Sequence, residues 1–312
     1  MRAAILREYG TTPELGDFYE PEAAEGRVVG EVLAAGLNPV DLRRASGTFY
    51  GGNPPLPSVA ASEGVARLTD GRRVYFDPPV APHGALAERT LLDPDAVFEI
   101  PGGTDDAVAV ALGIAGLAAW LALEWSARLR EGETVLVLGA SGTVGQIAVQ
   151  AARLLGAGRV IAAARSAAGL ERASALGADA TVALAGEDDL EQAFRDASGG
   201  GIDVTIDPLW GEPAIAALRA SNRFARHVAL GQSAAAETMV ACVDVRSKPL
   251  SIVGHTNYAV PLADRRDAYE RMAEHAANGD IEVDVERVRL DEAPAAWERL
   301  KAGPGVKLVV VP

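Results

Sequence analysis

The chain has 312 residues, of which 49% are hydrophobic and 23% are charged, and its formal net charge at pH 7 is −14. That length and composition suffice for a full hydrophobic core and for two lobes, while the acidic balance argues against nucleic acid or an anionic membrane surface as a partner. The single cysteine, Cys242, excludes an internal disulfide and a cysteine-rich zinc site. Because the first residues lack the apolar region of a signal peptide, we expect a cytoplasmic protein.

The first third of the chain predicts short β-rich pieces. Residues 28–37 are typical of a strand, 51–58 of a proline-rich loop, and 70–76 of a turn followed by a strand. The uncharged run Ala107–Leu123 is 17 residues long, at the lower limit for a membrane span, and two glycines interrupt it. We therefore expect a buried helix or helix pair there rather than a membrane segment.

From about Ala115 onward, strand patterns alternate with helical patterns. Such alternation predicts parallel strands joined by right-handed crossovers, and so an α/β fold with an open, doubly wound sheet. The expected strands are Thr134–Leu138, Arg159–Ala164, Ala180–Leu184, Asp203–Ile206, His227–Leu230 and Leu250–Val253. The intervening helical patterns are Ser166–Leu176, Asp188–Ala197 and Pro213–Ala220. The tail changes character, with helical patterns at 265–278 and 293–301 and strand patterns at 283–290 and 306–312.

The stretch GASGTVG, which begins at Gly139, follows a hydrophobic strand and opens a helix with one apolar face. Written against G-x-G-x-x-G, Ala140 takes the first glycine slot, and Gly142 and Gly145 fill the other two. Gly142 lets a pyrophosphate approach the backbone, and Gly145 lets the helix pack closely on the strand. Since the N-terminus of the helix also favours phosphate, the order of strand, turn and helix predicts a dinucleotide site. Ser141 is not expected to be a catalytic nucleophile, because Thr143 stands where the motif G-x-S-x-G requires its last glycine.

The end of the second strand bears on the choice between NAD and NADP. An NAD site places an acid there for the ribose 2′-hydroxyl, but here Ala164 is followed by Arg165 and Ser166, and the nearest acid is Glu171. A guanidinium and a hydroxyl suit a 2′-phosphate, so we expect NADPH or NADP⁺. The alternative is that Arg165 is a solvated residue at the start of a helix.

Several motifs together resemble one known family. They are AAGLNPVDLRRASG, PSVAASEGVA, HGALAERTLL, GIAGLAAWLAL, VLVLGASGTVGQIAVQAARLLGA with ALGAD, and the closing GDIEVDVERVRLDEAPAAWERLKAGPGVKLVVVP. They run nearly end to end, and the chain is similar to the zinc-independent quinone oxidoreductases, the ζ-crystallin-like group of the medium-chain dehydrogenase/reductase superfamily. The resemblance implies a GroES-like catalytic domain from residues 1–114 and 256–312. It also implies a Rossmann NADPH-binding domain at 115–255 and a homodimer formed through an edge strand near 250–253.

The same resemblance indicates whether the chain has a zinc site. Zinc-dependent relatives carry a cysteine ligand where Asn38 stands and a histidine ligand where Ser62 stands before Glu63. Neither ligand is present, and the four histidines, 83, 227, 255 and 275, are scattered. Zinc needs three or four protein ligands in a tetrahedral array, so we expect no metal site.

The resemblance also assigns site residues. It places Asn38 beside the nicotinamide as the best candidate for a catalytic hydrogen-bond donor, the alternative being an Asn-Pro turn residue. The family's tyrosine, a proton donor or substrate contact, is replaced by Phe49, with Tyr50 one step later. Both are candidate catalytic residues, the alternative for Tyr50 being a surface position. The family's nicotinamide-contacting threonine is Ala118 here, and its 2′-phosphate lysine is Gly169. The expected cofactor contacts are Asn38, Ala118, Ala140, Ser141, Gly142, Thr143, Val144, Ala164, Arg165, Ser166 and Gly231.

Without a Lewis acid to polarise an alcohol or aldehyde oxygen, a conjugated acceptor is the more tractable substrate. We therefore expect hydride transfer from NADPH to a small apolar quinone or α,β-unsaturated carbonyl. Two alternatives remain: an enoyl-thioester reductase that uses the same hydride step, and a non-catalytic NADPH-binding sensor or structural protein. The low lysine content speaks mildly against a thioester substrate.

Overall fold

The computed structural model describes all residues, 1–312, and its contacts divide the chain into two compact units. The first unit comprises Met1–Ile114, Tyr269–Gly279 and Val283–Pro312, and the second comprises Ala115–Ala268 and Asp280–Glu282. Residues 256–268, which the sequence resemblance assigns to the catalytic domain, pack within the second unit.

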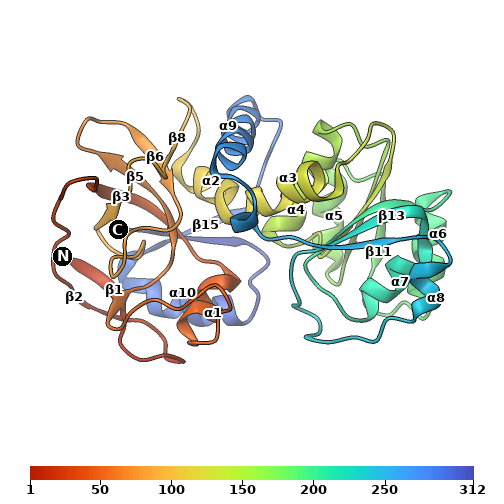
Figure 1. The fold of residues 1–312 in the computed structure, drawn as a ribbon, viewed down its shortest axis with the longest axis horizontal. Helices are drawn as coiled ribbons and strands as arrows, with labels where there is room; N and C mark the ends of the chain where they lie inside the picture. Colours follow the sequence, from red (N-terminus) through yellow and green to blue (C-terminus); the bar gives the residue numbers. More distant parts are fainter. The chain divides into compact units, whose positions relative to one another are not determined.

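The first unit is rich in strands (Figure 1). Its strands are β1 (Arg2–Leu6), β2 (Glu14–Asp17), β3 (Val28–Gly36), β4 (Ser58–Val59), β5 (Glu63–Leu68), β6 (Arg73–Phe76), β7 (Arg89–Leu92), β8 (Phe98–Glu99), β15 (Val285–Arg289) and β16 (Lys307–Val311). Its helices are α1 (Pro39–Ala45), α2 (Asp106–Ala111), the second half of α9 (Leu262–Asn278), η4 (Leu290–Glu292) and α10 (Ala293–Lys301).

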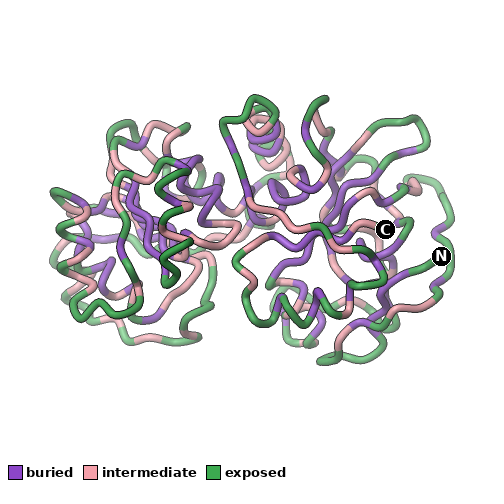
Figure 2. Tube along the Cα trace, turned by 180° about the vertical axis from the view of Figure 1, so that it is seen from behind, coloured by how far each residue is buried: buried purple, intermediate pink, exposed green.

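Two sheets organise these strands. The smaller sheet has the order β2-β1-β4, and the larger has the order β15-β16-β3-β5-β6-β8, with β7 pairing to β3. Most of these pairings are antiparallel, and the apolar faces enclose a core that includes Ile5, Phe76, Leu86 and Trp297. Buried stretches run through the interior of the trace, while many of the outer loops are exposed (Figure 2). This is the GroES-like, β-rich part of the fold.

The second unit holds one parallel sheet with the strand order β11-β10-β9-β12-β13-β14. Helices α6 and α7 cover the face of the sheet on which Leu136 and Ile161 lie. This order, in which the chain reverses direction from its first strand, is that of a Rossmann fold, so the predicted doubly wound sheet is confirmed. The elements are α3 (Leu117–Leu121), η2 (Ala122–Ala127), β9 (Thr134–Leu138), α4 (Thr143–Leu154), β10 (Arg159–Ala164), α5 (Ala167–Ala175), β11 (Ala180–Ala183), α6 (Leu190–Ser198), β12 (Ile202–Asp207), α7 (Glu212–Ala220), β13 (Ser221–Ala229), α8 (Cys242–Arg246), β14 (Ser251–Gly254) and η3 (Asn257–Ala259).

The apolar run forms a chain of short helices, as expected. It comprises α2, the π-helical η1 (Leu112–Gly116), α3 and η2, and Gly113 bends it with non-helical backbone angles. By length and composition alone, Asp106–Ala127 is the one stretch that qualifies as a candidate membrane span, with a mean hydropathy of 2.0. Because 78% of its most apolar window is buried inside the protein, it has the character of a core helix.

Two elements differ from the sequence expectation. Strand β13 begins at Ser221, directly after α7, instead of at His227. The first half of β13 lacks the alternation of buried and exposed residues that predicts a strand. Phe224 is exposed with φ of +63°, and the pairing register with β12 shifts there. Helix α1, which no sequence pattern predicts, follows Asn38, for which the alternative is an Asn-Pro turn. Pro39 at its first position is a favourable helix start.

Candidate active site

A buried polar network surrounds Asn38 in the first unit. Asn38 is 4% exposed and precedes α1. Its side-chain Nδ2 donates to Glu63 Oε1 at 2.6 Å, while its Oδ1 accepts from Lys307 Nζ at 2.6 Å. Its backbone N–H donates to Asp41 Oδ2 at 2.9 Å, which starts the helix. Asn38 is therefore more than a turn residue, because both ends of its amide are held by charged side chains.

Glu63 is the centre of this network and is fully buried. Its Oε1 accepts from the Asn38 amide and from the Lys307 ammonium, the latter at 2.5 Å. Its Oε2 accepts from the Tyr75 hydroxyl at 2.8 Å and from the backbone N–H of Ile114 at 2.6 Å. Four donors thus satisfy one carboxylate, which is the condition for a charge to be tolerated away from water.

Two tyrosines close one side of the network. Burial and the negative charge of Glu63 raise the pKa of the Tyr75 hydroxyl well above its ordinary value, so this hydroxyl stays protonated and donates. The Tyr269 ring stacks on the Tyr75 ring with centroids 4.8 Å apart, and its hydroxyl donates to the carbonyl of Ala109 at 3.0 Å. The same causes raise the pKa of Tyr269.

The sheet explains why these residues meet. Gly36, the last residue of β3, pairs with Glu63 on β5 and with Val309 on β16. This pairing brings together Asn38 after β3, Glu63 on β5 and Lys307 on β16. A Cβ on Gly36 would lie 2.4 Å from Glu63 Oε1, so only glycine leaves room for the carboxylate. Two residues before Glu63, Ala61 has φ of +62°, a strained value for alanine.

Asp41 is a second buried carboxyl, 2% exposed, beside the network. Besides the bond from Asn38, it accepts from the Ser62 hydroxyl at 3.0 Å. Burial, and then repulsion from the negative Glu63, raise the pKa of Asp41 to about 6 from an ordinary value of 3.8. Asn38 and Ser62, which stand where zinc-dependent relatives have ligands, are thus both engaged with protein groups.

Asp41→Asn should make the chain relatively more stable as the pH rises. Between pH 3.8 and about 6, folded Asp41 binds more protons than the unfolded chain, so wild-type stability falls through this window and stays lower above it. Asparagine can still accept from Asn38 and cannot ionise. The unfolding free energy of the variant minus that of wild type, measured with denaturant, should rise by roughly 2 kcal/mol between pH 4 and pH 7. A pH-independent difference would contradict the buried, shifted carboxyl.

The structure separates the two aromatic candidates. Phe49 is 8% exposed, and its ring lies 4.5 Å from that of Tyr50 and 5.5 Å from the Arg44 guanidinium. Tyr50 is 83% exposed in the loop that follows. Phe49 therefore acts as a packing residue in this conformation, whereas the Tyr50 hydroxyl is accessible to a ligand.

The four histidines do not form a cluster. His83 is buried against aromatic rings, and His227 pairs with Asp207 at 2.8 Å in the second unit. His255 lies 2.9 Å from the Ser126 hydroxyl. No group of three or more histidine, cysteine or acidic side chains is arranged to hold a metal ion anywhere in the chain.

The glycine turn in the second unit has the geometry that a phosphate site needs. Gly139 adopts φ of +66°, and the N–H of Gly142 donates to its carbonyl at 3.1 Å. Helix α4 starts after Gly142, and no side chain caps it, so its first N–H groups point out of the turn without a partner from a capping residue. Ala140 is fully buried, whereas Ser141, Gly142, Thr143 and Val144 are half-buried.

Gly145 and Gly142 of the motif have different structural roles. A Cβ on Gly145 would lie 2.4 Å from both Ala140 Cα and the Gly139 carbonyl oxygen, so glycine is required for α4 to pack on the turn. A Cβ on Gly142 would meet nothing closer than 3.6 Å. The space beside Gly142 is therefore open to a ligand, as the motif predicts.

The end of β10 carries a cation with no partner. Ala164 is buried, and Arg165 after it is exposed and makes no hydrogen bond or ion pair within the chain. Ser166 caps α5, since its Oγ accepts from the N–H of Gly169 at 3.2 Å. A Cβ on Gly169 would lie 2.4 Å from Ser141 Cβ, so the structure leaves no room there for a lysine side chain.

The remaining expected contacts lie at other points of the second unit. Ala118 is half-buried in α3. Gly231 follows β13, and a Cβ there would come within 2.7 Å of the Pro208 carbonyl. The structure thus brings Ser141 and the start of α5 together.

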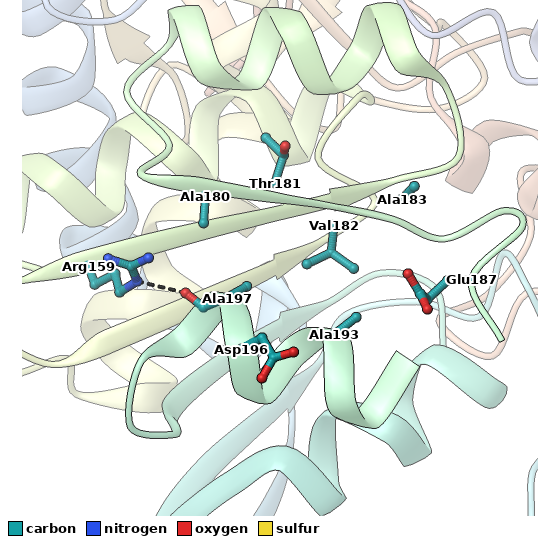
Figure 3. A pocket seen from close by; sticks show the side chains of 9 residues that line it. All are labelled: Arg159, Ala180, Thr181, Val182, Ala183, Glu187, Ala193, Asp196 and Ala197. Atoms are coloured by element: carbon teal, nitrogen blue, oxygen red, sulfur yellow. Dashed lines mark hydrogen bonds between the residues drawn. The ribbon is translucent and has the colours of Figure 1, made fainter. Parts of the chain in front are cut away.

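A surface cavity of about 430 Å³ lies elsewhere on the second unit, along the edge strand β11 (Figure 3). Arg159, Glu187 and Asp196 supply its charges, and the Arg159 Nε donates to the carbonyl of Ala197 at 2.7 Å. It includes no residue of the glycine turn and no residue from the end of β10. It is therefore not the candidate site.

Comparisons with known proteins bear on the assignment. A family model described as zinc-binding dehydrogenase matches residues 143–278. The solved quinone oxidoreductase of Thermus thermophilus, studied alone and in complex with NADPH, is 30% identical with a TM-score of 0.82, and the match covers 100% of each chain. The chain belongs to the quinone oxidoreductase group of the medium-chain dehydrogenase/reductase superfamily. The sequence resemblance is thereby confirmed.

Curated relatives match over a smaller share of their own length. The 2-methylene-furan-3-one reductase of Solanum lycopersicum is 32% identical over 58% of this chain and 52% of that protein. A phenolphthiocerol/phthiocerol polyketide synthase of Mycobacterium tuberculosis is 28% identical over 99% of this chain but only 15% of its own length. Both are enzymes, as are the quinone oxidoreductases, so the chain belongs to a group of enzymes.

Sequence reasoning missed Lys307, Glu63 and Tyr75 as members of the site. A lysine at the start of an otherwise apolar strand, VKLVVV, is the one signal that the sequence offers, because a buried lysine needs a partner. Nothing local indicates that this partner lies 244 residues earlier, at Glu63.

Proposed function

We propose that this chain is an NADPH-dependent oxidoreductase that reduces a quinone or an α,β-unsaturated carbonyl without zinc. The observation that carries the proposal is the glycine turn of the second unit, with open space at Gly142, an uncapped helix behind it and the unpartnered Arg165 nearby. The relationship to the Thermus thermophilus enzyme, which was solved with NADPH, supports the same cofactor.

The residues of the turn fit a dinucleotide phosphate. The N–H groups at the start of α4 would hold the pyrophosphate, and Gly142 would let it approach the backbone. Arg165 would face the 2′-phosphate, with the Ser166 hydroxyl still able to donate its proton while its oxygen caps α5. Ala164, Ala118, Thr143, Val144 and Gly231 remain proposed contacts along the same ligand. When bound, NADPH supplies a hydride.

Arg165→Ala should weaken NADPH binding by about tenfold or more and leave NADH binding within twofold. A charge-assisted bond to phosphate contributes at the low end of roughly 1.5–3 kcal/mol, because Arg165 is exposed. Isothermal titration calorimetry with each cofactor measures both affinities. Arg128→Ala, which removes another exposed arginine from the same unit, is the control. Equal losses for both cofactors would contradict the assignment.

At the acceptor, we propose that the chain uses Asn38. Negative charge develops on the acceptor's carbonyl oxygen during reduction, and a fixed N–H donor stabilises it. The Asn38 amide nitrogen carries two protons, and one of them is committed to Glu63. The second is the donor we assign to the substrate. The exposed Tyr50 is proposed as a further substrate contact, and Phe49 as the residue that packs beneath it.

The charges at the network support the proposed zinc independence. A divalent cation placed beside Asn38 would be repelled by the Lys307 ammonium, which is 2.6 Å from the Asn38 oxygen. Glu63 is saturated by four donors. Neither neighbour leaves the lone pairs that a metal needs.

NADPH consumption with a panel of acceptors tests the function. We expect turnover with a benzoquinone or a simple enone, followed at 340 nm. An enoyl thioester belongs in the panel because the polyketide synthase relative covers nearly the whole chain, and turnover with that acceptor alone would favour the enoyl-thioester alternative. Calorimetric binding of NADPH with no turnover of any acceptor would favour a non-catalytic sensor.

A homodimer is also proposed. Strand β14 pairs only with β13 and is the edge of the parallel sheet, and Ile252 on it is 40% exposed. An open apolar edge favours pairing with a second copy. Sedimentation should give twice the chain mass of 32.3 kDa.

The exposed free Cys242 suits the reducing cytoplasm in which we place the protein.

A further inference from the structure

Lys307 is the buried cation of the first unit. It is 2% exposed and is one of only three lysines in the chain. A buried ion pair with Glu63 is not by itself a source of stability, because desolvation offsets the attraction. The placement of Lys307 against Asn38 therefore calls for a role beyond that of a counter-ion.

The Lys307 ammonium decides which way the Asn38 amide faces. It donates to Asn38 Oδ1 at 2.6 Å, while Glu63 Oε1 accepts from Asn38 Nδ2 at 2.6 Å. A flipped amide would turn its NH₂ group toward the ammonium and its oxygen toward the carboxylate, which are two repulsive contacts. The pair of opposite charges thus holds the amide in one orientation.

The same bonds polarise the amide. The Lys307 ammonium on the amide oxygen withdraws electron density from the amide nitrogen. The Asn38 N–H that Glu63 does not use becomes a stronger donor than in a free amide. The Lys307 side chain reaches the Asn38 amide from β16, and that strand is fixed by pairing with β3 and β15.

We propose that Lys307 is a positioning residue that orients and polarises the Asn38 amide so that its second N–H stabilises charge on the acceptor oxygen. This inference rests on the proposed function. Lys307 thereby supplies, through one side chain, part of the electrophilic assistance that a metal ion would otherwise give.

The test compares Lys307→Met with Val310→Ala. Val310 is fully buried on the same strand and belongs to the other core face, so its truncation weakens β16 without touching the network. Lys307→Met should lower kcat by roughly 10- to 100-fold, with the Kd for NADPH unchanged within twofold, whereas Val310→Ala should keep kcat within twofold. Lys307→Arg, which keeps a cation, should restore part of the loss. Equal kcat values for the Met and Ala variants would overturn the proposal.

A double-mutant cycle shows whether Lys307 acts through Asn38. In an Asn38→Ala background, Lys307→Met should lower kcat no further; an equal further drop would overturn the proposal. Should Lys307→Met not fold, Glu63→Gln/Lys307→Met removes both charges together, and retention of wild-type kcat by that variant would overturn it as well.

A readout without cofactor separates this inference from the proposed function. In the cofactor-free protein, the Asn38 side-chain amide gives a pair of ¹H–¹⁵N signals, assigned by their loss in Asn38→Ala. Lys307→Met should shift both signals toward a free amide, and Val310→Ala should not. Absence of wild-type turnover with every acceptor contradicts the proposed function, whereas unmoved amide signals in Lys307→Met contradict this inference.

Discussion

Glu63→Gln should lower the unfolding free energy of the first unit by about 3–5 kcal/mol, the cost of leaving a buried charge without its partner. The Lys307 ammonium, now 2.5 Å from the carboxylate, would lose its counter-ion. Glutamine has one oxygen, but Glu63 accepts four bonds on two oxygens. In either orientation its NH₂ group would therefore face donors.

Denaturant unfolding at pH 7 measures this loss. Glu31→Gln is the matched control, because Glu31 lies on the adjacent strand β3 in an exposed pair with Arg67 at 3.4 Å, and such pairs contribute little. The double variant Glu63→Gln/Lys307→Met should recover part of the loss, since no unpaired charge remains buried. If Glu63→Gln unfolded like Glu31→Gln, the carboxylate would not be the centre of the network.

The parallel sheet was predictable because each strand is a short apolar run and each crossover carries a helical period, so local sequence reports both. The glycine turn was predictable for a similar reason, since strand, turn and helix are contiguous. The polar network was not. Lys307 and Asn38 are 269 residues apart, and only the pairing of β16 with β3 brings them together.

Local signals also failed where a side chain serves tertiary structure. The Asn38–Pro39 pair is also typical of a turn, which is the alternative for Asn38, but in the structure it starts α1, with Asp41 accepting the Asn38 N–H. Asp41 has no second carboxyl in the nearby sequence, although in the fold it lies close enough to Glu63 for their charges to interact. Burial and long-range charge, which decide the chemistry here, leave no periodic trace in the sequence.

Substitution of the two glycines of one turn by alanine should affect folding stability differently, although both variants should bind NADPH more weakly. Gly145→Ala places a methyl group 2.4 Å from the Ala140 Cα and from a backbone carbonyl oxygen, so α4 must move away from the turn. Overpacking of this kind costs about 1–3 kcal/mol, and the contact is with backbone that cannot rotate aside. We expect both the unfolding free energy of the second unit and NADPH binding to fall.

Gly142→Ala, by contrast, should fold normally and bind NADPH at least about tenfold more weakly, a change of about 1.4 kcal/mol. Gly142 has φ of −86°, which alanine adopts freely, and its added methyl would meet nothing closer than 3.6 Å. The methyl group would instead occupy the space through which the pyrophosphate approaches the backbone. Denaturant unfolding and calorimetry on the two variants separate the effects. Unchanged NADPH affinity in Gly142→Ala would remove the phosphate from this turn, because the substitution alters the open space there and little else.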